Sequence, residues 1–400
     1  MPHRRNWPLY LCGVLAPFAV FTNVDIGGLP ISLLWFFSAS AALKLRKTDL
    51  KFMAPFLLCV SLLALKIPIG GSLSVLLKYS IGVVYLFLLA KYDSMEPFLT
   101  GLLAGVCVTL PYAVYQWFIV MAGIDYKAAL AVLPVSTWNS QAWHVLLRDP
   151  AGLPRVSGFM YEPAYLAIVA NILLVGEMLY RHARPRKLVI ALGLLILVLA
   201  NSRTGFLTCA IIMLLAILSK RGWSGSVKVV FVLSAVGPLL PLVSLYSNIL
   251  DYRSVQEDID ISVFARYVSF VAFGQESLFN ILFGVADYTQ SYGANAVLQD
   301  YADLLTGQGS ERDPKSLLAA NLFSFGVLGS IVFYVLLYRA GRANLRALSI
   351  LAAANILFFN VYAYSWPLFW ILVAMAYQVR KAPSVKNAIL SSPQIKHEPV

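Results

Sequence analysis

Hydrophobic residues occur along this chain in long blocks that short polar segments separate. The blocks are about 15 to 25 residues long, which is the length that an α-helix needs to cross the hydrocarbon core of a bilayer. The chain lacks the segments of about ten residues with alternating apolar and polar positions that are typical of outer-membrane barrels. The pattern therefore predicts an all-α polytopic membrane protein with about twelve transmembrane helices.

The ends of the apolar blocks give the bounds of these helices. Pro111 lies inside one block and should kink that helix, because proline cannot donate a hydrogen bond to the carbonyl four residues earlier. The predicted spans are Trp7 to Val24, a segment ending near Leu43 after a turn at Asp25 to Pro30, Phe52 to Leu65, Leu73 to Ala90, Pro97 to Met121, Glu162 to Tyr180, Leu188 to Ala200, Gly205 to Leu218, Val229 to Tyr246, Leu317 to Leu337, Ala347 to Asn360, and Tyr362 to Val379.

The composition agrees with this class of protein. The chain has 400 residues, of which 60% are hydrophobic and 12% charged, and its mean hydropathy is +0.75. Soluble domains carry about 25% charged residues. The four cysteines lie inside predicted spans, without the spacing of a metal site or of loop disulfides, so we interpret them as small apolar residues. They are Cys12, Cys59, Cys107 and Cys209.

The net charge of +12 is unevenly distributed. Residues 251–315 hold ten acidic and four basic residues, whereas the rest of the chain holds nine acidic and 27 basic ones. The basic residues gather in both tails and in short loops, which the positive-inside rule assigns to the cytoplasm. This distribution argues against nucleic-acid binding and predicts that both termini are cytoplasmic. The basic loops are 44–51, 181–187, 219–228 and 338–346, and the segment 91–96 is assigned to the same side.

The topology predicts one transmembrane domain with its two long loops on the external side. In the larger loop, between the ninth and tenth helices, Val263, Tyr267, Val268 and Val271 recur at helical spacing, so part of this loop should lie along the bilayer surface. The predicted regions are the domain at 1–380, its external loops at 122–161 and 247–316, and a disordered cytoplasmic tail at 381–400.

Two segments place ionisable residues where a predicted span meets an external loop. The segment RVSGFMYEPAYLA carries Arg155 and Glu162, and the segment NSRTG carries Arg203. Charge at the edge of the hydrocarbon is costly and is usually kept for function. Guanidinium groups stay charged and bind phosphate oxygens through a planar fork. A third arginine, Arg266, lies in the larger loop, and together they suggest a polyanion site.

Each of these residues also has a structural interpretation. Arg155 could pair with Glu162 or anchor the helix at the membrane edge, and Glu162, just before Pro163, could be a favourable helix-N-terminal carboxylate or a general base. Arg203 could reach the interface by snorkelling, and Arg266 could be solvated.

Neutral donors and one lysine complete the candidate set. Asn201 and Ser202 crowd the turn that carries Arg203, which favours function there. Lys78 lies inside a span near its external end, where it could snorkel or line a cavity with the arginines. The sequence has no zinc motif, phosphate-binding glycine loop or nucleophile elbow.

Several segments occur in an order and spacing that resemble the Wzy-type polysaccharide polymerases and the related O-antigen ligases, which are polytopic glycosyltransferases of the GT-C class. The resemblance covers residues 99–338. Its parts are YQW at Tyr115 to Trp117, RVSGFMYEPAYLA, NSRTG, ARYVSFVAFGQESLFNILFGVADY at Ala265 to Tyr288, and NLFSFGVLGSIVFY at Asn321 to Tyr334.

The resemblance implies transfer of a glycan from undecaprenyl pyrophosphate to the next lipid-linked repeat unit, at the periplasmic face of the bacterial inner membrane, without a metal or other cofactor. Arg203 and Arg266 match the family's arginines and would bind the donor pyrophosphate. Arg155 and Glu162 match its G-x-x-x-E-P region, and Glu162 is the expected base. Further substrate-binding residues expected are Lys78, Gln116, Tyr161, Asn201 and Ser202.

Two other functions stay open at this point. The ligases typically carry a histidine near the start of the span after the large loop, where this chain reads LLAANLF, so the polymerase is favoured over the ligase. A lipid-linked oligosaccharide flippase or another transporter would fit the helix count, but we find no internal repeat of the kind common in transporters. Expected partners are the lipid-linked donor and acceptor, membrane lipid and a chain-length regulator protein, with no nucleic acid.

Overall fold

The computed structural model describes residues 6–18, 23–26, 29–32, 34, 50–124, 153–160, 163–181, 185–220, 269–287, 316–358 and 366–381. Side chains are described for these residues except 23–26, 29–32, 203 and 220. The predicted ninth span, most of the predicted second span and of both predicted external loops, and nearly all of the C-terminal tail fall outside them.

The described residues form helices almost throughout. Four of these helices are long and apolar enough to cross a membrane, at Leu50–Ile69, Glu96–Met121, Pro163–Tyr180 and Leu317–Gly341. Shorter apolar helices accompany them. The prediction of a helical membrane protein is supported, whereas the count of twelve spans and the large loop between the ninth and tenth stay predictions.

The helix bounds lie close to the predicted ones, and the helix α6 continues through Pro111. The elements are α1 Trp7–Leu15, β1 Asn23–Ile26, β2 Leu29–Ser32, α4 Leu50–Lys66 with the 3₁₀ turn η1 Ile67–Ile69, α5 Leu73–Leu89, α6 Glu96–Met121, α9 Pro163–Val175 with the π-helical turn η3 Gly176–Tyr180, α10 Lys187–Ala200, α11 Arg203–Lys220, α15 Leu278–Phe283, α19 Leu317–Gly341, α20 Leu345–Leu357 and α21 Pro367–Lys381.

The predicted first span is wrong at its C-terminal end. The helix α1 stops at Leu15 instead of Val24, and Pro17 follows in a turn. The expected turn at Asp25 to Pro30 belongs to an antiparallel hairpin in which β1 pairs with β2. Two glycines separate the strands in the sequence, and Gly-Gly favours a two-residue hairpin loop, since both central positions require positive φ.

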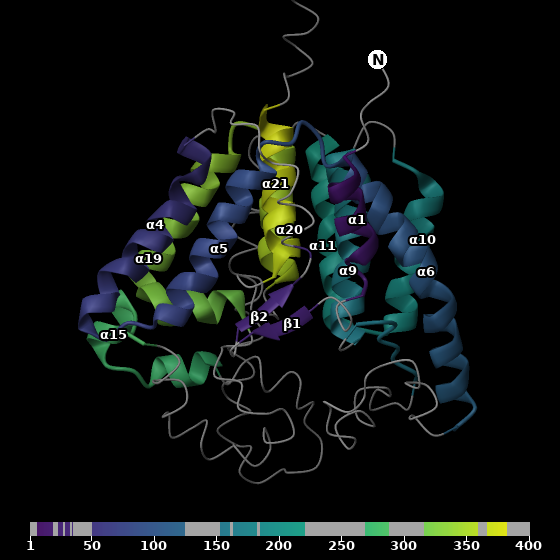
Figure 1. Ribbon diagram of the computed structural model, residues 1–400, viewed down its shortest axis with the longest axis horizontal. Coiled ribbons are helices and arrows are strands. Elements are labelled where there is room, and N and C mark those ends of the chain that lie inside the picture. The colour runs from purple at the N-terminus through teal and green to yellow at the C-terminus, as the bar shows by residue number, and fades with distance from the viewer. Residues whose placement is uncertain are drawn as a thin grey trace, which may run out of the picture.

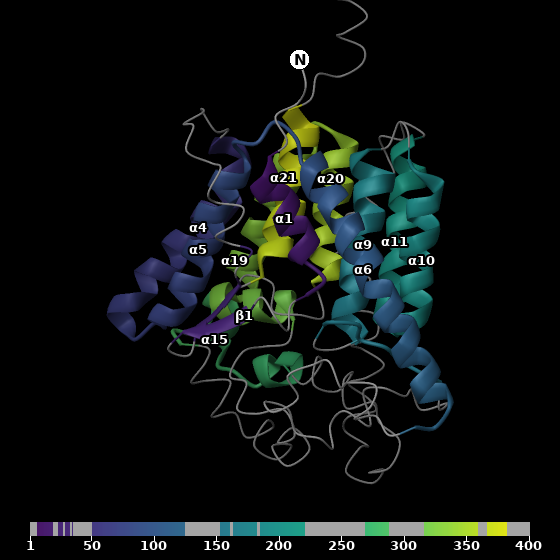
Figure 2. The same ribbon diagram turned by 45° about the vertical axis from the view of Figure 1, so that its right-hand side comes forward.

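The helices form two groups with a central pair between them (Figure 1). One group comprises α1, α6, α9, α10 and α11, and the other comprises α4, α5, α15 and α19. The helices α20 and α21 pack on each other and reach both groups, because α20 contacts α11 and α21 contacts α5. The turned view in Figure 2 keeps α6, α9, α10 and α11 side by side.

Glycines allow α1 and α6 to approach closely. A Cβ atom added at Gly101 would lie 2.0 Å from the carbonyl oxygen of Tyr10, and one at Gly105 would lie 2.3 Å from that of Val14. Small residues spaced four apart are typical of helix pairs in membranes, where packing replaces the hydrophobic effect as the force that holds helices together. The pair therefore fixes α1 against the group that carries the candidate site.

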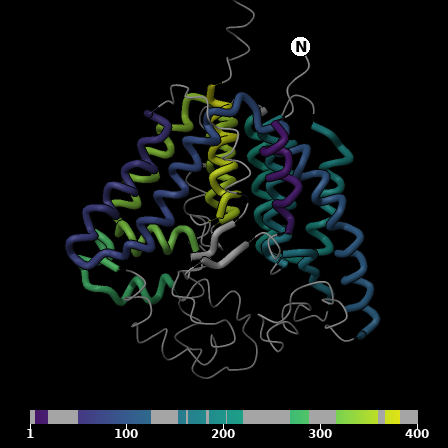
Figure 3. Tube along the Cα trace, viewed as in Figure 1, coloured from purple at the N-terminus to yellow at the C-terminus, as the bar shows by residue number. Residues whose placement is uncertain are grey.

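One end of the bundle is held by polar side chains. The hydroxyl of Tyr180 donates to Oε1 of Gln378 at 2.7 Å and accepts from the backbone N–H of Met95 at 3.0 Å. Asn344 donates to the carbonyl of Val379 at 2.8 Å. At one end of the bundle, which we call the Tyr180 end, α6, α10 and α20 therefore begin and α21 terminates. Figure 3 shows α1 starting and α21 finishing on this side.

Candidate functional site

The opposite end of the bundle, which we call the Arg155 end, contains a non-helical segment, residues 153–160, packed against α6. The backbone N–H of Gly158 donates to Oε1 of Gln116 at 2.8 Å, and Nε2 of Gln116 donates to the carbonyl of Gly158 at 3.4 Å. Gln116 is completely buried. Buried backbone polar groups need hydrogen-bond partners, and Gln116 supplies them to this segment at Gly158.

The same segment joins the end of α10. The backbone N–H of Val156 donates to the carbonyl of Leu199 at 3.2 Å. This bond places Arg155, whose side chain is half-buried with a buried Nε, beside the turn that connects α10 to α11. The structure therefore brings together the two segments that the sequence singled out, RVSGFM and NSRTG.

The turn itself is built by its polar residues. Asn201 ends α10 in the left-handed conformation, with φ 43° and ψ 47°. Asparagine tolerates this conformation better than most residues. The buried Ser202 caps α11, because its hydroxyl accepts from the N–H of Gly205 at 3.3 Å. These two predicted substrate-binding residues thus have structural roles that start α11 at Arg203.

The helices α9 and α11 are held together next to this turn. Nδ2 of Asn171, which is fully buried, donates to the carbonyls of Ala167 at 3.0 Å and Gly205 at 3.1 Å. A Cβ atom at Gly205 would lie only 2.6 Å from the Cβ atom of Ala167. The position of the first turn of α11 relative to α9 is therefore set by close packing.

Several predicted site residues fall outside what the structure describes. Tyr161, Glu162 and Arg266 are not among the described residues, although α9 begins directly after Glu162. Arg203 is the first residue of α11, and its side chain is not described. Lys78 lies half-buried in the first two turns of α5, in the other group of helices. The structure brings together the segments of Arg155 and Arg203 but leaves Lys78 on a different group.

An aromatic stack extends from the Arg155 segment across α6. Phe159 lies between Phe18, at a centroid distance of 5.1 Å, and Tyr112, at 4.5 Å, and the ring of Tyr112 stacks on Tyr115 at 6.1 Å. Tyr115 is 44% exposed and shares a face of α6 with the exposed Phe118. The stack thus leads from the exposed, apolar face of α6 to the segment that carries Arg155.

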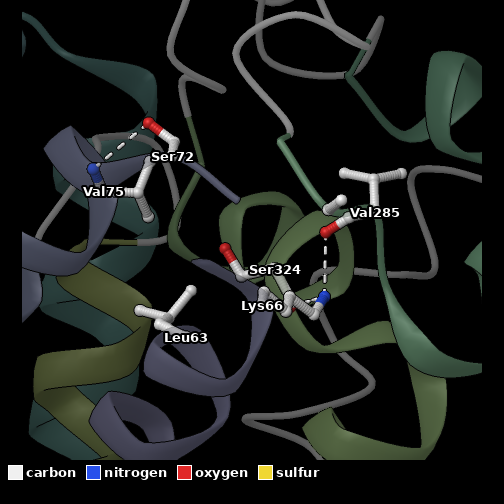
Figure 4. A pocket seen from close by; sticks show the side chains of 7 residues that line it. Leu63, Lys66, Ser72, Val75, Val285 and Ser324 are labelled. Atoms are coloured by element: carbon white, nitrogen blue, oxygen red, sulfur yellow. Dashed lines mark hydrogen bonds between the residues drawn. The ribbon is translucent and has the colours of Figure 1, made fainter. Parts of the chain in front are cut away.

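Sequence reasoning missed a third polar feature, at Lys66 (Figure 4). The Nζ atom of Lys66 donates to the carbonyls of Phe283 at 3.2 Å, Val285 at 2.8 Å and Ser324 at 2.6 Å. These bonds join α4 to α19 and to residues 269–287, the described part of the segment that the sequence predicts to be the larger external loop. The signal available in the sequence was a lysine at the end of an apolar span, followed by Pro68.

The backbone of α19 is interrupted at the same place. Gly326 has φ 66° and ψ −175° inside the helix, and Gly284 has φ 80°. A Cβ atom at Gly326 would lie 2.3 Å from the carbonyl oxygen of Leu282. The N–H of Val285 donates to the carbonyl of Phe323 at 2.8 Å. Two of the segments that carry the family resemblance are therefore packed together in space.

The described residues contain no group of three or more histidine, cysteine, aspartate or glutamate side chains that could hold a metal ion. No protein-family model, no curated protein and no solved structure matches this chain.

Proposed function

We propose that the chain is a membrane glycosyltransferase, a polysaccharide polymerase that transfers a glycan from undecaprenyl pyrophosphate to a lipid-linked repeat unit. The observation that supports this proposal best is the hydrogen bond from Val156 to Leu199, because it places the segments of Arg155 and Arg203 side by side. Two guanidinium groups on adjoining segments suit a ligand with two phosphate groups.

The position of Arg203 gives a second reason. Its place in the first turn of α11 is unfavourable for a cation, since the helix dipole puts partial positive charge there and a wrong-signed side chain costs about 0.3–1 kcal/mol. The same helix terminus favours an anion. Arg203 and the start of α11 would therefore both be stabilised by a bound pyrophosphate.

In the proposed reaction, the bond between the anomeric carbon of the donor glycan and a pyrophosphate oxygen breaks. The acceptor hydroxyl oxygen forms the new bond to that carbon, and its proton passes to the carboxylate of Glu162. Undecaprenyl pyrophosphate leaves with the electron pair, and the arginines, with Arg266, stabilise its charge as it departs. The aromatic stack at Phe159 and Tyr112 offers the polyprenyl chain an apolar route from the exposed face of α6.

A deletion strain tests the reaction class. We expect loss of long glycan chains, with single repeat units still transferred to their final acceptor. A ligase would instead leave lipid-linked polymer that is not attached to its acceptor. A flippase would leave repeat units on the cytoplasmic side, with purified protein moving them across vesicles without forming glycosidic bonds. Either of the last two results would reject the polymerase.

A further inference from the structure

The three carbonyl oxygens around Lys66 form a cage of the kind that binds a monovalent cation. They lie 2.6–3.2 Å from Nζ and come from two separate segments, Phe283 and Val285 on one side and Ser324 on the other. An ammonium group has three donors and no acceptor. Backbone carbonyls replace the hydration shell of potassium in channel filters, and unwound carbonyls bind sodium in transporters.

The cage exists because two helices stop there. The break at Gly326 frees the carbonyl of Ser324 from the α-helical ladder, and α15 ends at Phe283. Carbonyls at the end of a helix carry partial negative charge and have no partner within the helix. Without a cation, the carbonyls of Phe283 and Ser324 and that of Val285, just after α15, would face one another at the junction of α4, α15 and α19.

The hydroxyl of Ser324 offers a further oxygen in the small pocket beside the cage. The side chain of Ser324 is 1% exposed, and its hydroxyl is buried without a hydrogen-bond partner. Ser324 lines a small pocket together with Lys66, Val285 and Ser72, as Figure 4 shows. Lys66 is only partly buried, so ions from the solvent have access to the site.

We propose that the Lys66 ammonium is a tethered monovalent cation, and that its carbonyl cage takes up potassium or ammonium when the side chain is removed. Lys66 is then a positioning residue: its charge holds residues 269–287 against the break in α19. A further step rests on the proposed function. By holding residues 269–287, the charge of Lys66 also fixes the loop that carries Arg266, which lies just before residue 269 in the sequence.

Thermal unfolding of the full-length protein in nanodiscs tests the cage without reference to activity. Wild type and Lys66→Ala are melted in choline chloride, potassium chloride and ammonium chloride at equal ionic strength. We expect Lys66→Ala to melt lower than wild type in choline, and potassium or ammonium to raise its midpoint saturably. Wild type should melt alike in all three salts. A Lys66→Ala midpoint that does not depend on the cation overturns the proposal.

Further variants separate the cage from a simple loss of packing. Lys78→Ala, which removes another partly buried lysine, one near the start of α5, should show no cation effect. Lys66→Met fills the space without charge and should not be rescued. Ser324→Ala in the Lys66→Ala background should raise the potassium concentration needed for half of the rescue. If Lys66→Ala does not accumulate, Lys66→Ser, which leaves the cage open, is melted in the same salts. Rescue of Lys66→Met to the same extent as Lys66→Ala would overturn the proposal.

Polymer synthesis in the same salts tests the positioning role. Lys66→Ala should lose kcat in choline and regain it in potassium, with KM for the acceptor little changed. Loss of kcat that potassium does not restore, in a protein whose melting it does restore, would overturn the positioning role. If wild type makes no polymer, the proposed function fails, and the melting experiment still decides the cage.

Discussion

The backbone N–H of Val156 donates to the carbonyl of Leu199, and this bond joins two segments that are far apart in the sequence. Each segment carries an arginine at the same end of the bundle. The bond fixes the backbone of the first segment, and Gln116 fixes it a second time at Gly158. The separation of Arg155 from the start of α11 is therefore set by the buried polar contacts of three different elements.

Replacing Gln116 with leucine should loosen the segment at 153–160. The change leaves the buried N–H of Gly158 without a partner, which costs about 1–3 kcal/mol, and leaves its carbonyl with only the 3.5 Å bond from the hydroxyl of Ser157. We expect a lower unfolding midpoint and faster proteolysis near residue 155. Phe118→Leu, on the exposed face of the same helix, is the control and should change neither. Equal effects of the two changes would contradict the role of Gln116 in holding residues 153–160.

Gly326→Ala should disrupt the junction of α19 with α15. Its φ of 66° disfavours any L side chain, and the added Cβ atom would lie 2.3 Å from the carbonyl oxygen of Leu282. We expect this variant to lose more stability than any other single glycine-to-alanine change at the Arg155 end of the bundle. Gly274→Ala, where an added Cβ atom meets nothing within 4 Å, is the matched control. The comparison is made by thermal unfolding of the two purified variants.

Gly205→Ala should shift the start of α11 away from α9, because its Cβ atom would lie 2.6 Å from that of Ala167. On the proposed function, transfer activity should fall with the displacement of Arg203. The double variant Ala167→Gly with Gly205→Ala makes room for the added methyl group and should recover part of the activity. Activity that the second change does not improve would show that the spacing of these two helices is unimportant.

Two glutamates at the Tyr180 end differ in burial, and this difference predicts how much their ion pairs contribute to stability. Glu177 is fully buried and pairs with Arg186 at 2.5 Å and Arg181 at 3.5 Å, whereas Glu96, which also pairs with Arg181, is 45% exposed. Breaking a buried pair leaves its partners uncompensated, but an exposed pair contributes little. Glu177→Gln should therefore lower the unfolding midpoint clearly more than Glu96→Gln. Similar midpoints for the two variants would mean that burial of Glu177 does not matter.

The sequence predicted the helices well and their junctions poorly. The block of apolar residues from Leu73 gave α5 almost to the residue, since helix length and hydropathy fix a membrane span. The same measure extended α1 to Val24, because hydropathy alone does not distinguish an apolar helix from the apolar strands on either side of Gly27 and Gly28. Junctions depend on partners that are distant in the sequence, which hydropathy does not record.

In the candidate site, too, the sequence predicted individual residues but not their contacts. Arg155 and Arg203 could be selected from sequence because charge is unusual beside an apolar span. The support of Gly158 by Gln116 could not be, since a glutamine within a span does not reveal which backbone it contacts. Lys66 was likewise passed over, because its three carbonyl partners come from the end of α15, from the residues just after it, and from a helix break that the apolar pattern of 317–337 conceals.

Transfer of glycan by purified protein in liposomes tests the central claim most directly. Arg155→Ala and Arg203→Ala are compared with Arg339→Ala, an exposed arginine near the far end of α19. With undecaprenyl-pyrophosphate-linked repeat units as substrate, we expect both site variants to lose at least about 100-fold in kcat/KM, as loss of charge stabilisation at a leaving group does elsewhere. Arg339→Ala should match wild type. Polymer formed at wild-type rates by both site variants would contradict the account.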